Sequence, residues 1–262
     1  PQTRSSFWMN SRNFSEPRGV RAMPNTGSAS RVRIAGSARM ARISRSSRCV
    51  TAAGVAAGNA LQKNDLGTLI ITGNNSGRSG TTTIVAGVIQ VNDANALGGG
   101  QIRLNHPSGG GAALHLSGGV ALANAIDMAV GAFGATGINN TGGVFSLSGV
   151  NSIGSVGAVT NSGSTGITFG SANGATLNIG SLALGNSPTF NTVGTGIINI
   201  NGSGTSGVTI AKVGAGTLNW TTAQTTGLAF AVNQGTFNIS GTGAFSSATG
   251  NITVQNNALL NV

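Results

Sequence analysis

The side chains that could carry acid–base chemistry are few in this chain of 262 residues, which contains four carboxylates and two histidines. Enzymes that cleave glycosidic bonds hold two carboxyl groups several ångströms apart, and Asp65, Asp93 and Asp127 are the candidates beyond residue 58. Asp93 falls in a turn-like segment, where an aspartate usually caps the turn. Asp127 alternates with Ile126 and Met128, which predicts a solvent-facing side chain. We therefore predict no catalytic carboxylate pair.

The histidines and the single cysteine do not form the pattern of a known catalytic or metal site. His106 lies in a Gly-rich turn, and His115 lies between Leu114 and Leu116, so its side chain is expected on the opposite face, toward solvent. No Gly-x-Ser-x-Gly motif accompanies them. One cysteine excludes an internal disulfide framework and a Cys-based zinc site. We predict no catalytic residue, no metal site and no cofactor.

Two glycine patterns resemble ligand-binding loops. Residues 202–207 fit Gly-x-Gly-x-x-Gly, but that motif binds a dinucleotide only where a helix follows, and the next residues, 208–210, are strand-like. The glycine triplets at 98–100 and 109–111 lack the aspartate of calcium-binding nonapeptide repeats. We interpret these patterns as turns.

The basic residues are concentrated at the start of the chain. Ten of the 14 basic residues are arginines within residues 1–50, accompanied by one acid, Glu16. This Arg- and Ser-rich stretch has no apolar periodicity, so we predict a disordered tail over residues 1–58. A misassigned gene start or an organelle transit peptide are alternatives. Such a tail could also bind nucleic acid electrostatically, although no specific nucleic acid is expected.

The second part, residues 59–262, repeats runs of three to five residues in which apolar and polar side chains alternate. In one run, Leu177 and Ile179 are expected on one face of a strand and Asn178 on the other. A sandwich, a barrel or a solenoid could hold such strands. The 44 glycines, the short runs and the scarcity of large aromatics favour a parallel β-solenoid, in which exposed Asn and Thr stack into hydrogen-bonded ladders.

Three consecutive segments, 63–75, 79–91 and 95–100, resemble the passenger-associated strand repeat of bacterial autotransporters. They contain, in order, a Gly-Thr-Leu strand, a Thr-Gly-Asn turn, a Gly-Thr-Thr strand start, a second Gly-led strand and an Ala-Leu-Gly corner. Gly77 departs from the repeat, which usually has an aromatic residue there. The matching structural positions are Gly67, Thr68, Leu69, Ile71, Gly73, Asn74, Gly80, Thr81, Gly87, Val91, Ala96, Leu97 and Gly98.

A second, weaker copy lies near residues 212–262. Lys212 opens it as Lys63 opens the first, and it lacks the Thr-Gly-Asn turn. Its matching positions are Gly216, Thr217, Leu218, Gly235 and Thr236.

The resemblance implies an all-β chain, a right-handed parallel β-helix over residues 59–262. It implies an internal part of a passenger, exported to the bacterial surface through a C-terminal outer-membrane barrel. The expected function is a surface-exposed or secreted structural stalk or adhesin that acts through its polar surface. Its partners would be host or bacterial surface molecules, or further copies of itself. A β-helix enzyme that degrades polysaccharides, or a nucleic-acid-associated protein, is the alternative.

Overall fold

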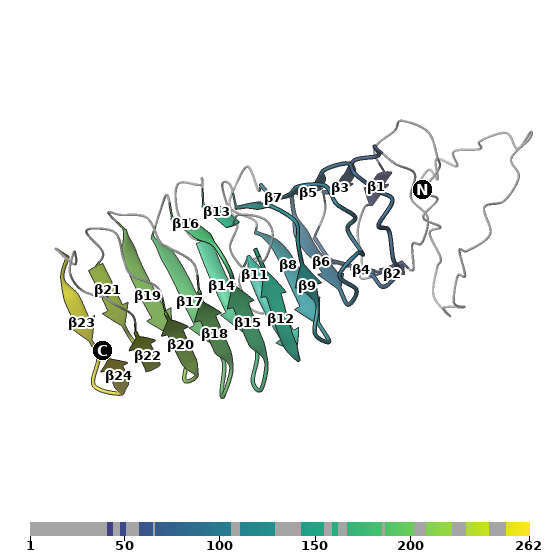
Figure 1. Ribbon diagram of the computed structural model, residues 1–262. Helices are drawn as coiled ribbons and strands as arrows, with labels where there is room; N and C mark the ends of the chain where they lie inside the picture. Colours follow the sequence, from purple (N-terminus) through teal and green to yellow (C-terminus); the bar gives the residue numbers. More distant parts are fainter. Residues whose placement is uncertain are drawn as a thin grey trace, which may run out of the picture.

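The computed structural model describes residues 41–43, 48–50, 58–64, 66–105, 111–128, 143–154, 159–161, 167–184, 187–201, 208–221, 229–240 and 250–262. Every regular element in these ranges is a β-strand, and the strands pair in parallel into three sheets. The chain winds from sheet to sheet and returns one coil further along the rod (Figure 1). The prediction of an all-β parallel solenoid is confirmed.

Sheet A contains seven short strands in chain order. Its strands are β1 (Ala41–Ile43), β3 (Leu61–Lys63), β5 (Thr82–Ile84), β7 (Ile102–Leu104), β10 (Ile126–Met128), β13 (Val159–Asn161) and β16 (Leu182–Leu184).

Sheet B contains ten strands and runs the length of the described solenoid. Its strands are β2 (Arg48–Val50), β4 (Thr68–Ile71), β6 (Gly87–Val91), β8 (Ala112–Ser117), β11 (Val144–Ser148), β14 (Ile167–Ser171), β17 (Pro188–Thr192), β19 (Thr209–Val213), β21 (Ala229–Val232) and β23 (Ile252–Val254).

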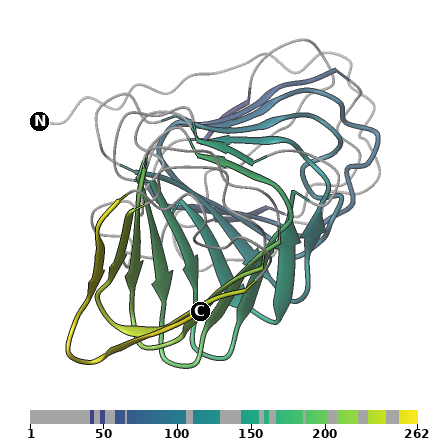
Figure 2. The same cartoon turned by 60° about the vertical axis from the view of Figure 1, so that its left-hand side comes forward.

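Sheet C contains seven strands. Its strands are β9 (Ala121–Leu122), β12 (Val150–Ile153), β15 (Thr176–Ile179), β18 (Ile197–Ile200), β20 (Thr217–Trp220), β22 (Gly235–Ile239) and β24 (Ala258–Asn261). Its first strand is β9, which follows β7 of sheet A and β8 of sheet B in the chain. Figure 2, which turns the view by 60°, shows strands of successive coils lying side by side toward the yellow C-terminal end.

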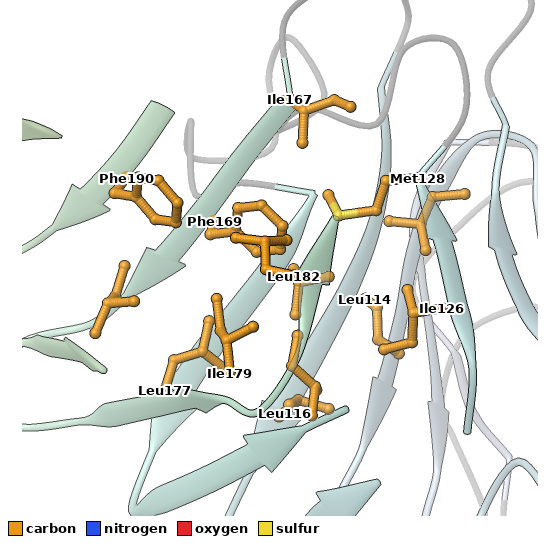
Figure 3. Packing of buried hydrophobic residues seen from close by; sticks show 14 of the residues in the cluster. Leu114, Leu116, Ile126, Met128, Ile167, Phe169, Leu177, Ile179, Leu182 and Phe190 are labelled. Atoms are coloured by element: carbon orange, nitrogen blue, oxygen red, sulfur yellow. The ribbon is translucent and has the colours of Figure 1, made fainter. Parts of the chain in front are cut away.

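The core is a set of stacked columns, because parallel pairing places each inward residue over its counterpart in the next coil. In sheet C, Leu177 pairs with Ile198, and Ile198 pairs with Leu218. All three side chains are fully buried. In sheet B, Phe169 pairs with Phe190, and their rings stack with centroids 5.4 Å apart. Figure 3 shows Leu177, Phe169 and Phe190 among the inward side chains that fill the interior between the sheets.

Two strands lie inside the stretch predicted as a disordered tail. β1 pairs with β3 and β2 pairs with β4, so the solenoid as described includes residues 41–43 and 48–50. The remainder of residues 1–57 lies outside the described residues.

The corner at residues 98–100 shows why particular glycines are needed. Gly98 has a φ of 66°, and an added Cβ there would meet the backbone carbonyl of Arg78 in the coil below. A Cβ on Gly100 would meet the carbonyl of Gly80, whereas a Cβ on Gly99 would have nothing within 4 Å. Two of the three glycines therefore allow the backbones of neighbouring coils to approach closely.

Replacing Gly98 by alanine is expected to lower the free energy of unfolding by about 1–3 kcal/mol, because it combines a left-handed backbone with a clash against a carbonyl. Gly99→Ala is the matched control, and we expect it to change the free energy of unfolding by less than about 0.5 kcal/mol. Urea unfolding of the two variants measures the difference. Equal midpoints for both would contradict the close approach at Gly98.

Candidate functional site

The first strand-repeat copy lies on sheets A and B. Its Gly-Thr-Leu strand is β4, the Gly-Thr-Thr segment leads into β5, and the second Gly-led strand is β6. Leu69 and Ile71 pair with Ile89 and Val91, so β4 and β6 form two buried columns. The turn residues 73–74 and the residues 80–81 connect these strands.

Three glycines of this copy have a left-handed backbone, which favours glycine. Gly67 and Gly87 have φ values of 104° and 73°. Ala96 and Leu97 are buried, and Gly98 completes the Ala-Leu-Gly corner with a positive φ. Gly77, where the repeat usually has an aromatic residue, has nothing within 4 Å of an added Cβ, so a large side chain there would extend into open space.

The second copy has the same internal arrangement but lies one sheet further round the rod. Its Gly-Thr-Leu strand is β20 of sheet C, followed by β21 of sheet B and by β22 of sheet C. Thr217 pairs with Thr236, and Gly235 has a φ of 73°. In both copies, the chain forms a strand in one sheet, a strand in a second sheet and then another strand in the first sheet. The repeat does not determine which two sheets these are.

The two lysines that open the copies are buried structural groups. Nζ of Lys212, which is fully buried, donates to the carbonyls of Val213, Gly214 and Gln234 at 3.0, 2.6 and 2.9 Å. Nζ of Lys63 donates to the carbonyl of Ala86 at 3.1 Å. Each ammonium group therefore satisfies carbonyls at the bend that leads into the next strand. The sequence identified these positions, but their role becomes visible only in the folded chain.

The stability of the coil around Lys212 is expected to depend on pH in the alkaline range. Burial lowers the pKa of Lys212 from 10.5 to about 8, so between these values the unfolded chain binds more protons than the folded chain. The urea midpoint should therefore rise as the pH increases from 8 to 10.5. Fluorescence of the buried Trp220, in a Trp8→Phe background, reports unfolding of this coil.

Lys212→Met is the matched variant, because it keeps an unbranched side chain and removes the titrating amine. Its urea midpoint should not rise between pH 8 and 10.5. The chain contains no tyrosine that would titrate in this range. A rise of the same size in Lys212→Met would show that another group is responsible.

Arg78 is the other cation held inside the described solenoid. It is 3% exposed and lies in the turn after β4. Its Nε donates to the carbonyl of Asn59 at 2.9 Å, and its two terminal nitrogens donate to Oγ1 of Thr82 and to the carbonyls of Thr81 and Leu97. Burial lowers the pKa of Arg78 from its ordinary value. The guanidinium thus connects three successive coils.

The aspartates have structural partners in the described part of the chain. Oδ1 of Asp93 accepts a bond from the backbone N–H of Asn95 at 2.7 Å, which is the turn-capping contact predicted from its position. The prediction that Asp127 faces solvent is wrong. Asp127 is 8% exposed, and its Oδ2 accepts a bond from Nε of Arg103 at 3.0 Å, because β7 and β10 place the two residues in register. Asp65 lies outside the described residues.

His115 also differs from its prediction. It does lie opposite the core residues Leu114 and Leu116, but it is only 7% exposed. The register of β8 and β11 places it beside Phe145, and the two rings lie 5.6 Å apart. Burial lowers its pKa to about 4. His106 and residues 202–207 lie outside the described residues.

Within the described ranges, no three His, Cys, Asp or Glu side chains gather where they could hold a metal ion. The same residues include no helix long and apolar enough to cross a membrane.

The most extended polar arrangement of the described residues is an asparagine ladder on the outer face of sheet C. Five consecutive strands each contribute one asparagine. In each pair, Nδ2 donates to Oδ1 of the asparagine one coil back, over 2.7–2.8 Å and across 19–23 residues of sequence. The ladder consists of Asn178, Asn199, Asn219, Asn238 and Asn261. The predicted stacking of exposed asparagines is confirmed.

A shallow hollow of about 350 Å³ lies at the N-terminal end of this ladder. It is lined by Ser152, Ile153, Asn178, Gly180 and Asn201, which belong to or directly follow the strands β12, β15 and β18. Ser152 pairs with Asn178, so the hydroxyl continues the asparagine column by one coil. The hollow therefore combines a hydroxyl and two amides with a glycine that leaves room.

Sheet C also differs from the other sheets in charge. None of its seven strands contains a charged residue. Sheet A contains Arg42, Lys63, Arg103 and Asp127, and sheet B contains Arg48 and Lys212. The ladder and the hollow therefore form an uncharged hydrogen-bonding face, which we call the amide face.

Comparison of the chain with protein-family models, with curated proteins and with solved structures gave no match. The described residues establish a parallel β-solenoid of about seven turns.

Proposed function

We propose that this chain is part of a bacterial autotransporter passenger, a structural stalk and adhesive surface exposed on the cell or secreted. The observation that supports this most directly is the amide face, which repeats one hydrogen-bonding side chain per coil along a parallel solenoid. The two strand-repeat copies supply the link to autotransporters, since both lie on strands and corners of the coils.

The contacts that hold the coils together support the proposed stalk function. Each coil contacts its neighbours through in-register parallel strands, so length is added without long-range contacts. Buried columns, the asparagine ladder and Arg78 each connect adjacent coils. Bending the rod would have to break several of these contacts at once.

The repetition of the same side chain in successive coils supports the proposed adhesive function. A single amide that bonds to a partner in water contributes little net free energy. Several amides at a fixed spacing can engage one extended partner together, which raises the apparent affinity without any strong single contact. The partners of such a surface would be host or bacterial surface molecules, or other copies of the chain.

Export as a passenger fits the low cysteine content, because an internal disulfide would oppose passage through a narrow pore unfolded. We expect a C-terminal outer-membrane barrel in the full-length protein. We propose no enzymatic activity and no cofactor for this part of it, because Asp93 and Asp127 are each engaged in a structural contact.

Bead adhesion tests the proposal. Latex beads coated with the chain would be exposed to fixed epithelial cells and to a surface coated with the same chain, under flow. We expect several-fold more beads to remain than with an albumin coating, on at least one surface. Retention equal to albumin on both surfaces would contradict an adhesive function.

A further inference from the structure

The outward side chains of sheet C form two columns that run along the rod. One column is the asparagine ladder, preceded by Ser152. The other contains Val150, Thr176, Ile197, Thr217, Thr236 and Leu259, which pair in register from strand to strand. All of these side chains are exposed or partly exposed. The amide face thus presents a continuous polar column beside a column of mixed hydroxyl and aliphatic side chains, and no charge.

The ladder leaves hydrogen-bonding capacity for a partner. An asparagine amide has two N–H donors and an oxygen with two lone pairs. Each internal rung uses one N–H toward one neighbour and one lone pair toward the other. One donor and one lone pair of each internal rung are therefore not used within the ladder.

We infer that the amide face binds a neutral, extended glycan chain, with one sugar unit seated in the hollow at Ser152 and Asn178. This inference rests on the adhesive function proposed above and names the class of partner. A donor and an acceptor on one amide match the adjacent hydroxyls of a sugar ring, which can each donate and accept. Successive coils lie about 4.8 Å apart, which is close to the length of one pyranose unit in an extended β-linked chain.

The charge of the face selects against other partners. A nucleic acid or an acidic polysaccharide would lose hydration of its anionic groups against sheet C without meeting a cation there. The four basic residues beyond residue 58 do not provide one, because Lys63, Arg78, Arg103 and Lys212 lie outside sheet C and three of them are buried. A neutral glycan loses no such hydration.

The face contains no aromatic side chain among its outward columns, so each sugar unit would be held by hydrogen bonds and aliphatic contacts alone. Single units should therefore bind weakly, and affinity should grow with the number of units that reach successive rungs. This length dependence separates a ladder from an ordinary single-sugar pocket.

The test measures binding of cellohexaose, chitohexaose and cellobiose to the 262-residue chain by titration calorimetry. We expect at least one neutral hexaose to bind about tenfold or more tightly than cellobiose. No binding of either neutral hexaose, or equal affinity for the disaccharide, would overturn the inference.

Site variants locate the binding. Ser152→Arg places a long charged side chain in the hollow and should abolish hexaose binding. Thr189→Arg is the matched control, because Thr189 is also partly exposed and lies on a strand of sheet B, and it should bind normally. If Ser152→Arg does not fold, the exposed rim residue Asn201 provides the same test as Asn201→Arg. Undiminished binding in the folded hollow variants would overturn the assignment.

The bead assay keeps this inference separate from the proposed function. Two results together would support both the adhesive function and the glycan site. Beads coated with the Ser152→Arg chain would no longer be retained, and soluble hexaose would inhibit retention of beads coated with the unchanged chain. Retention without hexaose binding leaves the adhesive function standing and overturns the glycan assignment. Hexaose binding without bead retention supports the glycan site and contradicts adhesion. A dimer that forms through the amide face and is not dissociated by hexaose would identify a second copy as the occupant and overturn the inference.

Discussion

Replacing Arg78 by alanine is expected to lower the free energy of unfolding of the first coils by about 3–5 kcal/mol. The change removes a buried side chain and leaves the carbonyls of Asn59, Thr81 and Leu97 without the donor that now bonds to them. Charge-assisted hydrogen bonds contribute about 1.5–3 kcal/mol each, and truncation of a large buried side chain adds a cavity cost. Few other single changes in the described solenoid remove as many contacts.

The measurement must resolve part of the rod, because coils of a solenoid can open separately. Hydrogen exchange of the amides in β3 to β7 should accelerate strongly in Arg78→Ala, while those in β18 to β22 should change little. Arg103→Ala is the matched control, since the Arg103 side chain is 49% exposed and a partly exposed ion pair contributes about 1 kcal/mol or less. Similar exchange in the two variants would mean that Arg78 does not connect the coils.

Acid should destabilise the solenoid through His115. Burial lowers its pKa from 6.5 to about 4. Between these values the unfolded chain binds the extra proton, so stability is complete above pH 6.5 and declines as the pH falls toward 4. One pKa unit corresponds to about 1.4 kcal/mol, so the full shift is worth roughly 3 kcal/mol.

Urea unfolding at pH 7.5 and at pH 4 measures this loss. His115→Gln keeps a polar side chain between Gln90 and Phe145 and removes the imidazole, so its midpoint should change much less with pH. His106→Gln removes the other histidine of the chain and should keep the full dependence. The proposal for His115 fails if the two variants respond to acid alike.

The fold was predictable because the information for it is local. Alternation placed Leu177 and Ile179 on the buried face of a strand and Asn178 on the other, and the structure has this arrangement. The corners of the coils were equally predictable from their glycines, since positions such as Gly98 have a positive φ. In a solenoid, the same local rules repeat in every coil, so no distant pairing has to be inferred.

The environment of the charged and polar residues was not predictable in the same way. The alternation of apolar and polar residues predicts on which face of a strand a side chain lies, and it predicted the outer face for His115 and Asp127. It does not predict which other side chains cover that face, and both residues are buried. Arg78 shows the same limit, because its partners come from residues 19 positions away on both sides of the sequence, a relation fixed only by coil length.

The asparagine ladder was predictable in part. The outward position of Asn178 follows from its own strand, but the hydrogen bond from Asn199 requires that the two strands pair without a shift of even one residue. The hollow beside the ladder depends in addition on Gly180 and Asn201, which follow two different strands. Its formation could be seen only once the coils were stacked.

The displacement of the strand repeat by one sheet has a consequence for how such rods can change. The first copy uses sheets B and A, and the second uses sheets C and B, although the backbone stacking continues without interruption in sheet B. The same repeat can therefore occupy different faces of a rod whose backbone stacking in sheet B stays in place. A duplicated repeat could carry its side chains to another face in this way, while the spacing between coils is kept.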